Sequence, residues 1–211
     1  MKKSIIFTGL FITSLCLASH VFAQDSASNV KQQLKDKLYN LRTYQAKFTQ
    51  TVTDSEGTVL QEAQGKIVMS QPNKLYWELL EPNESILLAD GDTLWNIDSF
   101  MEQVVAYDQN LAIENNPLIL LTDPYSKKWQ DYNVAIAAEE FIIEPISANG
   151  SIEVLRLFFK GEKLLGLETR DTQQQTSRLT FSDIQQNKDI LQSMFSFSLP
   201  IGYELDDQRN P

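Results

Sequence analysis

Turn-forming residues punctuate this sequence at short intervals, and their spacing limits the fold more than any other feature. Gly, Pro, Asn and Asp gather in short segments that separate runs of apolar and β-branched residues: 54–57, 71–73, 81–83, 90–91, 149–150 and 160–162. These residue types readily adopt the backbone angles of tight turns. Runs of strand length joined by tight turns pair most simply as consecutive hairpins. We therefore predict a mainly β chain with one large antiparallel sheet.

Alternation within the runs supports this prediction. Leu75, Trp77 and Leu79 share one face of their predicted strand, and Tyr76 and Leu80 lie on the opposite face. Apolar residues thus occur on both faces, which means that both faces need cover.

Few segments have a helical pattern. Apolar residues recur at helical spacing over 29–41, where Asn29 and Gln32 match the start of a capping box. This pattern predicts an amphipathic helix that lies on the sheet. A short helix is also predicted over 188–194, before a strand-like run at 195–200.

The segment 115–124 predicts a very short helix. Asn116 is a candidate N-cap, Pro117 suits the first helical position, and Pro124 discourages continuation. The four residues 118–121 are all apolar, so this helix has no polar face and needs tertiary contacts. It is either a plug in an ordinary core or a lid over an apolar hole.

The apolar surface exceeds what these helices can cover. The run 154–159 is apolar on both faces, and Trp77, Trp95 and Trp129 add further surface. Such a sheet either rolls up and fills its interior with side chains, or stays partly open and leaves an apolar concavity for a ligand. The second alternative explains the lid.

The N-terminus has the pattern of an export signal. Lys2 and Lys3 precede an apolar run at 5–18, and the segment 21–23 ends in small residues at the positions that a signal peptidase reads. We predict cleavage after Ala23. The run is too short to indicate a membrane-spanning helix, so we expect one exported domain at 24–211 without stable membrane insertion.

Cys16 could in principle carry a lipid anchor. Lipoprotein processing requires a small residue just before the cysteine and usually Leu two residues further back, but Leu15 and Thr13 occupy these places. We therefore expect Cys16 to be removed with the signal.

Composition excludes several functions. The only Cys and the only His, Cys16 and His20, lie in the predicted signal. The remaining chain therefore cannot use His-based catalysis, Cys–His nucleophiles or Cys/His zinc sites, and neither a metal nor a cofactor is expected. With 28 acidic against 18 basic residues and a net charge of −10, the chain should be repelled by nucleic acid and anionic headgroups.

An enzyme built on carboxylates is the main alternative from a different class. Glu78, Glu81, Glu84 and Asp90 are the candidates, but they surround two turns, where solvated carboxylates are ordinary. Only a cleft with paired carboxylates would favour catalysis. We predict no catalytic residue.

Several segments in order resemble the family of periplasmic outer-membrane lipoprotein carriers, LolA. They are VTDSEGTVLQEAQG, PNKLYW, PNESILLADGDTLW, MEQ, NNPLILL and DDQRN, and they extend through most of the chain after residue 23. The resemblance implies an unclosed antiparallel half-barrel in which short helices form a lid over the concave apolar face.

The resemblance also implies a function. A monomeric periplasmic carrier would bind the acyl chains of lipoproteins released by an inner-membrane ABC transporter and deliver them to an outer-membrane receptor, LolB. The missing lipid-attachment motif around Cys16 favours the carrier over this related, lipid-anchored receptor. A third alternative is a different periplasmic binder of lipids or lipoproteins, such as a sensor module.

Correspondence with the family assigns residues to the acyl-chain site. Leu118, Ile119 and Leu121 would belong to the lid, and Phe48, Leu75 and Trp77 would line the wall. Carriers of this kind usually have Arg at the position of Gln71, where it bonds to the lid backbone. Glutamine can donate from its amide but lacks the charge and the fork of donors. Gln71 is therefore a weakened latch.

Overall fold

The computed structural model describes residues 22–80, 84–113, 117–147 and 150–209. Its helices and strands follow one another in this order: α1 (Phe22–Asn40), β1 (Thr43–Thr53), β2 (Val59–Ser70), β3 (Lys74–Leu79), β4 (Ser85–Ala89), β5 (Thr93–Asp98), β6 (Gln103–Asp108), α2 (Gln109–Ala112), η1 (Pro117–Thr122), η2 (Lys127–Asp131), β7 (Tyr132–Ala137), β8 (Glu140–Pro145), β9 (Ile152–Lys160), β10 (Lys163–Asp171), β11 (Thr176–Gln186), η3 (Gln192–Phe195) and β12 (Glu204–Asp207). The three η segments are 3-10 helices.

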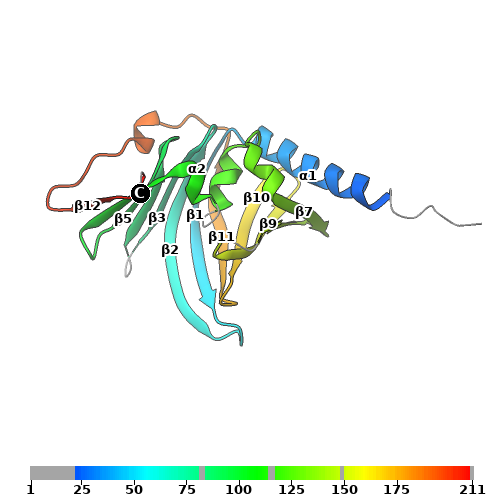
Figure 1. Ribbon diagram of the computed structural model, residues 1–211, viewed down its shortest axis with the longest axis horizontal. Coiled ribbons are helices and arrows are strands. Elements are labelled where there is room, and N and C mark those ends of the chain that lie inside the picture. Colours follow the sequence, from blue (N-terminus) through cyan, green and yellow to red (C-terminus); the bar gives the residue numbers. More distant parts are fainter. Residues whose placement is uncertain (1–21, 81–83, 114–116, 148–149, 210–211) are drawn as a thin grey trace, which may run out of the picture.

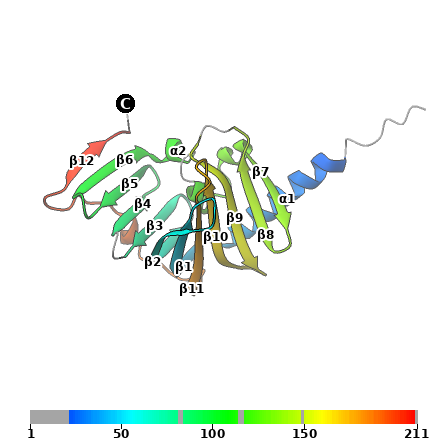
Figure 2. The same cartoon turned by 90° about the horizontal axis from the view of Figure 1, so that it is seen from below.

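All strands join one curved sheet, as predicted. The strand order is β12-β6-β5-β4-β3-β2-β1-β11-β10-β9-β8-β7, and every neighbouring pair is antiparallel except β12–β6. Figure 2 shows the sheet bending from β12 at one edge to β7 at the other. The two edge strands do not pair, so the sheet is the expected unclosed half-barrel.

The sheet consists of two meanders that meet where β1 pairs with β11. Two long connections therefore cross from one half to the other. We call residues 109–131, which include α2, η1 and η2, the lid segment. We call residues 187–203, which include η3, the strap segment. Figure 1 shows the lid segment in green near the centre and the strap segment in orange, running to β12.

The turn predictions agree with the structure where it describes them. Turns or bends occur at 54–57, 71–73 and 161–162, and Asp90 accepts hydrogen bonds that close the turn before β5. The predicted turn at 81–83 lies outside the described residues, as does Asn149 of the turn at 149–150.

The first helix starts earlier than predicted. α1 begins at Phe22, so the prediction of an N-cap at Asn29 is wrong: Asn29 lies inside the helix, where its side chain accepts a hydrogen bond from Gln33. The apolar positions of 29–41 do face the core, and Leu34 and Leu38 are fully buried. No helix in the described part of the chain is long and apolar enough to cross a membrane.

The end of the chain also differs from the prediction. A short helix, η3, overlaps the end of the region 188–194 predicted to be helical and extends to Phe195, but the run 195–200 forms no strand. Phe195 and Phe197 instead pack on the convex face of the sheet. An extended chain that lies across a sheet shows the same alternation of side chains as a strand that pairs within it, which explains this error.

Apolar side chains form one cluster on each face of the sheet. The concave cluster includes Leu75, α1 and the lid segment, and the convex cluster contains Val68, Trp95 and Phe195. The alternation predicted from the sequence is correct, because Leu75, Trp77 and Leu79 pack on the concave side and Tyr76 on the convex side. The convex cluster occupies only the β2–β6 half of the sheet.

Candidate functional site

A cavity of about 290 Å³ lies between the concave face and the lid segment. Its lining comes from seven strands and η1: Gln50, Trp77, Ser85, Leu87, Asn96, Leu118, Ile152, Leu167, Thr169, Ser177 and Leu179. Most of the large side chains in this lining are apolar. The cavity is therefore suited to an apolar ligand.

Two of the predicted site residues face the cavity directly. Trp77 lines it from β3, and Leu118 lines it from the first turn of η1. The ring of Phe48 lies behind the wall, with its centroid 4.8 Å from that of Trp77 and only 2% of the residue exposed. Phe48 thus supports the wall by holding the indole in place.

The other predicted residues are packed more deeply. Leu75 is fully buried, and Ile119 and Leu121 are each 2% exposed within the concave cluster. These three side chains anchor β3 and η1 in the core. Among residues 118–121, Leu118 lines the cavity and the other three side chains hold η1 against the core.

The sequence prediction missed the opposite wall of the cavity. Leu167 on β10 and Leu179 on β11 are directly paired across the strands, and Leu87 on β4 is paired with Trp77. Their common destination depends on the pairing of β1 with β11, which joins segments more than 120 residues apart.

Gln71 does act as a hydrogen-bond donor, but toward α1. Its Nε2 donates to the carbonyl oxygens of Leu38 at 2.6 Å and Leu41 at 2.9 Å. Leu38 lies in the last turn of α1, and Leu41 is the first residue after the helix. Carbonyls at the end of a helix lack partners from a following turn, so the amide serves as a C-terminal cap. No hydrogen bond found for the described residues joins the Gln71 side chain to 118–121.

The contact to the lid segment comes from Asn73, two residues further on. Its backbone N–H donates to the carbonyl of Thr122 at 3.2 Å, at the end of η1. Asn73 has φ of 63°, a left-handed conformation that Asn tolerates better than most residues. The turn 71–73 therefore holds both α1 and η1.

Gln109 extends this arrangement to the turn before β5. It is 3% exposed, and both ends of its amide are used: Nε2 donates to Asn73 O at 2.8 Å, and Oε1 accepts from Gly91 N at 3.1 Å. A buried amide with both ends paired fixes its neighbours because losing either bond leaves a buried polar group unsatisfied.

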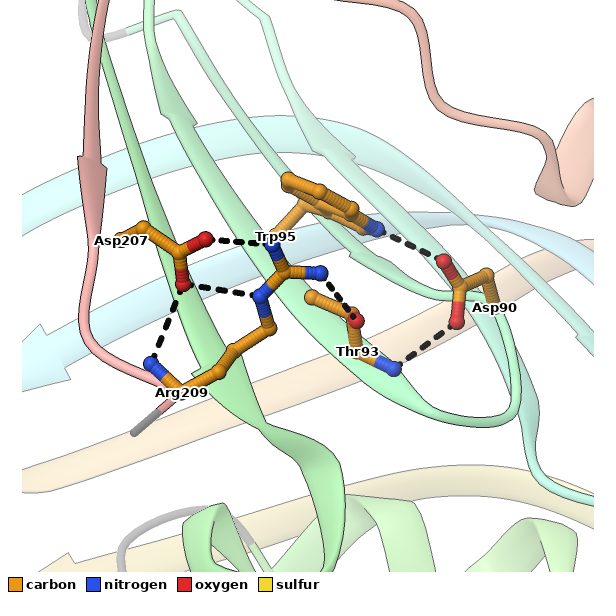
Figure 3. Close-up of polar contacts among 5 residues, drawn as sticks. All are labelled: Asp90, Thr93, Trp95, Asp207 and Arg209. Carbon is orange, nitrogen blue, oxygen red and sulfur yellow. Dashed lines mark hydrogen bonds and ion pairs between the residues drawn. The ribbon is translucent and has the colours of Figure 1, made fainter. Parts of the chain in front are cut away.

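Residues 206–209 of the segment DDQRN lie at the β12 edge of the sheet, and Asn210 lies outside the described residues (Figure 3). Arg209 contacts both carboxylate oxygens of Asp207, with Nε 2.8 Å from Oδ1, and its guanidinium lies 5.2 Å from the ring centroid of Trp95. The indole N–H of Trp95 in turn donates to Asp90 at 2.8 Å. These contacts bind the end of the chain to the turn before β5.

Both carboxylates of this group have lowered pKa values. Hydrogen bonds from Arg209 lower the pKa of Asp207 to about 2. Burial acts to raise the pKa of Asp90, but hydrogen bonds from Thr93, Trp95 and Asp92 and the charge of Arg209 outweigh it, so that this pKa is also lowered. Asp207 and Asp90 therefore accept these hydrogen bonds best as charged carboxylates.

Two of the carboxylates weighed as catalytic candidates make other contacts. Glu78 lies on the convex side and pairs with Lys66 at 2.5 Å, and Asp90 closes a turn. Glu81 lies outside the described residues. Within the described ranges, no three His, Cys, Asp or Glu side chains are grouped so that they could hold a metal ion.

The open sheet, the apolar cavity and the covering helix define a binding protein for apolar ligands. A sequence model of the family described as "Outer membrane lipoprotein carrier protein LolA" matches residues 39–198. The chain therefore belongs to the LolA family of outer-membrane lipoprotein carriers, a family of carriers and not of enzymes.

Relatives of this family extend over the whole chain. An outer-membrane lipoprotein carrier protein of Shewanella sediminis is 35% identical over 209 residues, which cover 99% of this chain and 98% of the relative. The corresponding protein of Actinobacillus succinogenes is also 35% identical, with the same coverage. Among solved structures, a conserved uncharacterized protein of Thermus thermophilus has a similar fold, with a TM-score of 0.52, 12% identity and coverage of 84% of this chain and 98% of that one.

Proposed function

We propose that this chain carries lipoproteins by taking their acyl chains into the cavity under η1. The observation that carries the proposal is the apolar concave wall of Trp77, Leu87, Leu167 and Leu179, closed by Leu118, in a member of the lipoprotein carrier family. Each methylene removed from water contributes about 0.8 kcal/mol, so an acylated protein cannot cross an aqueous space unaided.

The lid segment must move when cargo enters. A cavity of about 290 Å³ is at the lower limit of roughly 300–1,000 Å³ that accommodates one small ligand. Several acyl chains need more space. Since η1 is held at its end by the hydrogen bond from Asn73 to Thr122, the proposed motion separates η1 from the turn 71–73.

The proposed route follows the family. The carrier works in the periplasm as a monomer, receives its cargo from an inner-membrane ABC transporter and gives it to the outer-membrane receptor LolB. No cofactor takes part. The Gln71 latch would act in this cycle by holding the end of α1 beside the cavity.

The test of this function is a competition experiment. An environment-sensitive apolar dye should bind the folded protein and be displaced by a triacylated lipopeptide, but far less well by the same peptide without acyl chains. Equal displacement by both peptides would exclude acyl burial as the basis of recognition.

Processing separates the carrier from the anchored receptor. Cleavage after Ala23 would give an exported chain that starts at Gln24. Intact mass of the exported protein measures this directly. A diacylglyceryl group on Cys16 would favour the receptor instead.

A further inference from the structure

The cavity wall is not uniformly apolar. Five polar residues line it together with the apolar ones: Gln50, Ser85, Asn96, Thr169 and Ser177. A container for hydrocarbon alone needs no polar group in its wall, because a buried polar group costs free energy unless it is hydrogen-bonded. The position of these residues in the sheet therefore matters.

The polar residues do not form one row across the sheet, because Gln50 is paired with Leu179 and Asn96 with Leu87. They share a different feature, which is that each lies beyond an apolar residue on the same face of its own strand. On β10 and β11, Leu167 is paired with Leu179, and two residues further along the same face Thr169 is paired with Ser177. The cavity thus changes from apolar to polar along the direction of the strands.

Other strands repeat this change in the same direction. Gln50 follows Phe48 on β1, and Ser85 precedes Leu87 on β4. Because β1 and β4 run in opposite directions within the antiparallel sheet, both polar residues lie toward the end of the sheet that carries the β1–β2 turn at 54–58. Figure 1 shows this end extending away from α1 and α2.

Gln50 has hydrogen-bonding capacity to spare. Its Nε2 donates to Ser177 Oγ at 2.7 Å, whereas its Oε1 is buried and accepts from none of the residues that the structure describes. Since a hydroxyl can both donate and accept, one end of the Gln50 amide stays unused in either orientation of the amide group. A ligand that pairs with this end removes the cost of an unsatisfied buried atom.

We infer that the polar group of Gln50, Ser177 and Thr169 binds the amide and ester groups of an acylated N-terminal cysteine. The inference rests on the proposed carrier function. The N-acyl amide of such a cysteine offers one N–H donor and one carbonyl acceptor, which match the unused end of Gln50 and the hydroxyl of Ser177. The acyl chains then extend between Leu167, Leu179 and Trp77 toward the helices.

This subsite gives the carrier a means of selection. An acylated cysteine combines hydrocarbon chains with an amide, whereas a simple hydrocarbon offers only chains. The apolar wall holds both kinds of ligand by burial, and the polar group of Gln50, Ser177 and Thr169 favours the acylated cysteine. A hydrogen bond that is made only with the amide-bearing ligand adds about threefold to tenfold in affinity.

The experiment measures two ligands on one variant. In Gln50→Leu, the dissociation constant of a tripalmitoylated cysteinyl peptide should rise about threefold to tenfold, while that of the apolar dye should not rise, because Leu makes the wall more apolar. Gln64→Leu is the matched control. Gln64 is an exposed glutamine on β2, and its side chain lies on the face of the sheet opposite to that of Gln50. Gln64→Leu should change neither constant.

A second variant keeps the test valid if Gln50→Leu does not fold. Ser177→Ala keeps Gln50 in place but removes its partner, and should weaken only the lipopeptide. An equal change for lipopeptide and dye, or none for the lipopeptide in both variants, would overturn the polar subsite while leaving the carrier function intact. Failure of the unaltered protein to prefer the acylated peptide would overturn the carrier function itself, and the subsite with it.

Discussion

The lid segment and the strap segment cover apolar surface on opposite faces of the sheet. Each crosses from one meander to the other, and each covers an apolar surface that the strands leave exposed. The strap packs directly on the sheet, with Phe197 stacked on Trp95 at a centroid distance of 3.8 Å. The lid leaves a cavity between Leu118 and the opposite wall.

The difference between the two faces shows how one sheet can be stable and still bind a ligand. On the convex face, interdigitated side chains fill the space and stabilise the β2–β6 half. On the concave face, three of the four apolar residues of 118–121 anchor η1, and the fourth covers a space that remains open to a ligand. Breaking the strap should therefore affect stability, whereas altering the cavity side of the lid should affect binding.

The largest expected effect is in the strap. Phe195 is 3% exposed in the convex cluster, so Phe195→Ala should lower the free energy of unfolding by about 3–5 kcal/mol. Chemical denaturation measures this loss. The dye should still bind the folded variant with unchanged affinity, because the cluster lies on the other face. A loss of dye affinity would mean that the two faces are coupled.

Two leucines of η1 allow its core side and its cavity side to be tested separately. Leu120 is 1% exposed, and Leu120→Ala should cost about 2–5 kcal/mol of stability. Leu118→Ala should cost less, because part of its side chain borders the cavity rather than packed neighbours. It should instead weaken acyl binding by about tenfold or more, through loss of apolar contact. Equal stability losses with binding intact in Leu118→Ala would make η1 an ordinary core plug.

A smaller effect is expected at the turn that holds the helices. Gln71→Ala removes two hydrogen bonds to the end of α1 and should lower stability by about 1–3 kcal/mol. Hydrogen exchange at the Leu41 amide, which donates to Leu38 O, should become faster. Gln71→Arg is the control, since it retains donors at this position and should keep exchange at or below the original rate. If exchange in Gln71→Ala becomes faster at 118–121 and stays unchanged at Leu41, Gln71 stabilises η1 and not the end of α1.

The smallest effect concerns acid pH. The pKa of Asp207 is about 2, below its ordinary value of 3.8, so its contribution to folding is complete above the ordinary value and is lost as the pH falls through about 2. Asp90 contributes in the same direction. Amide exchange in β12 should therefore accelerate in acid before exchange in β1 and β2 does. Asp207→Asn should remove most of this pH dependence, and persistence of the full dependence in that variant would exclude Asp207 as its source.

The sequence predicted the sheet because its determinants are local. Turn residues mark the ends of strands, and alternation assigns Trp77 and Tyr76 to opposite faces without knowledge of any partner. The position of the cavity could not be predicted in this way. Leu167, Leu179 and Gln50 reach it only through the pairing of β1 with β11, which closes a loop of more than 120 residues.

The errors have a similar origin. Residues 195–200 alternate like a strand, yet their backbone lies across the sheet and not within it. The hydrogen-bond partners of Gln71 depend on where α1 ends in space, although the residue itself was recognised as important from the sequence. Patterns along the chain thus predict which face a residue occupies, but not which distant segment covers that face.

The most direct test locates the acyl chain in the bound protein. A lipopeptide with a photoreactive group at the end of one acyl chain can be cross-linked to the protein and the labelled residues identified by mass spectrometry. If the chains enter the cavity, labels should appear on the concave wall and lid, at Trp77, Leu167, Leu179 or Leu118. Labels confined to the convex side, at Phe195, Phe197 or the exposed Ile201, would contradict binding in the cavity.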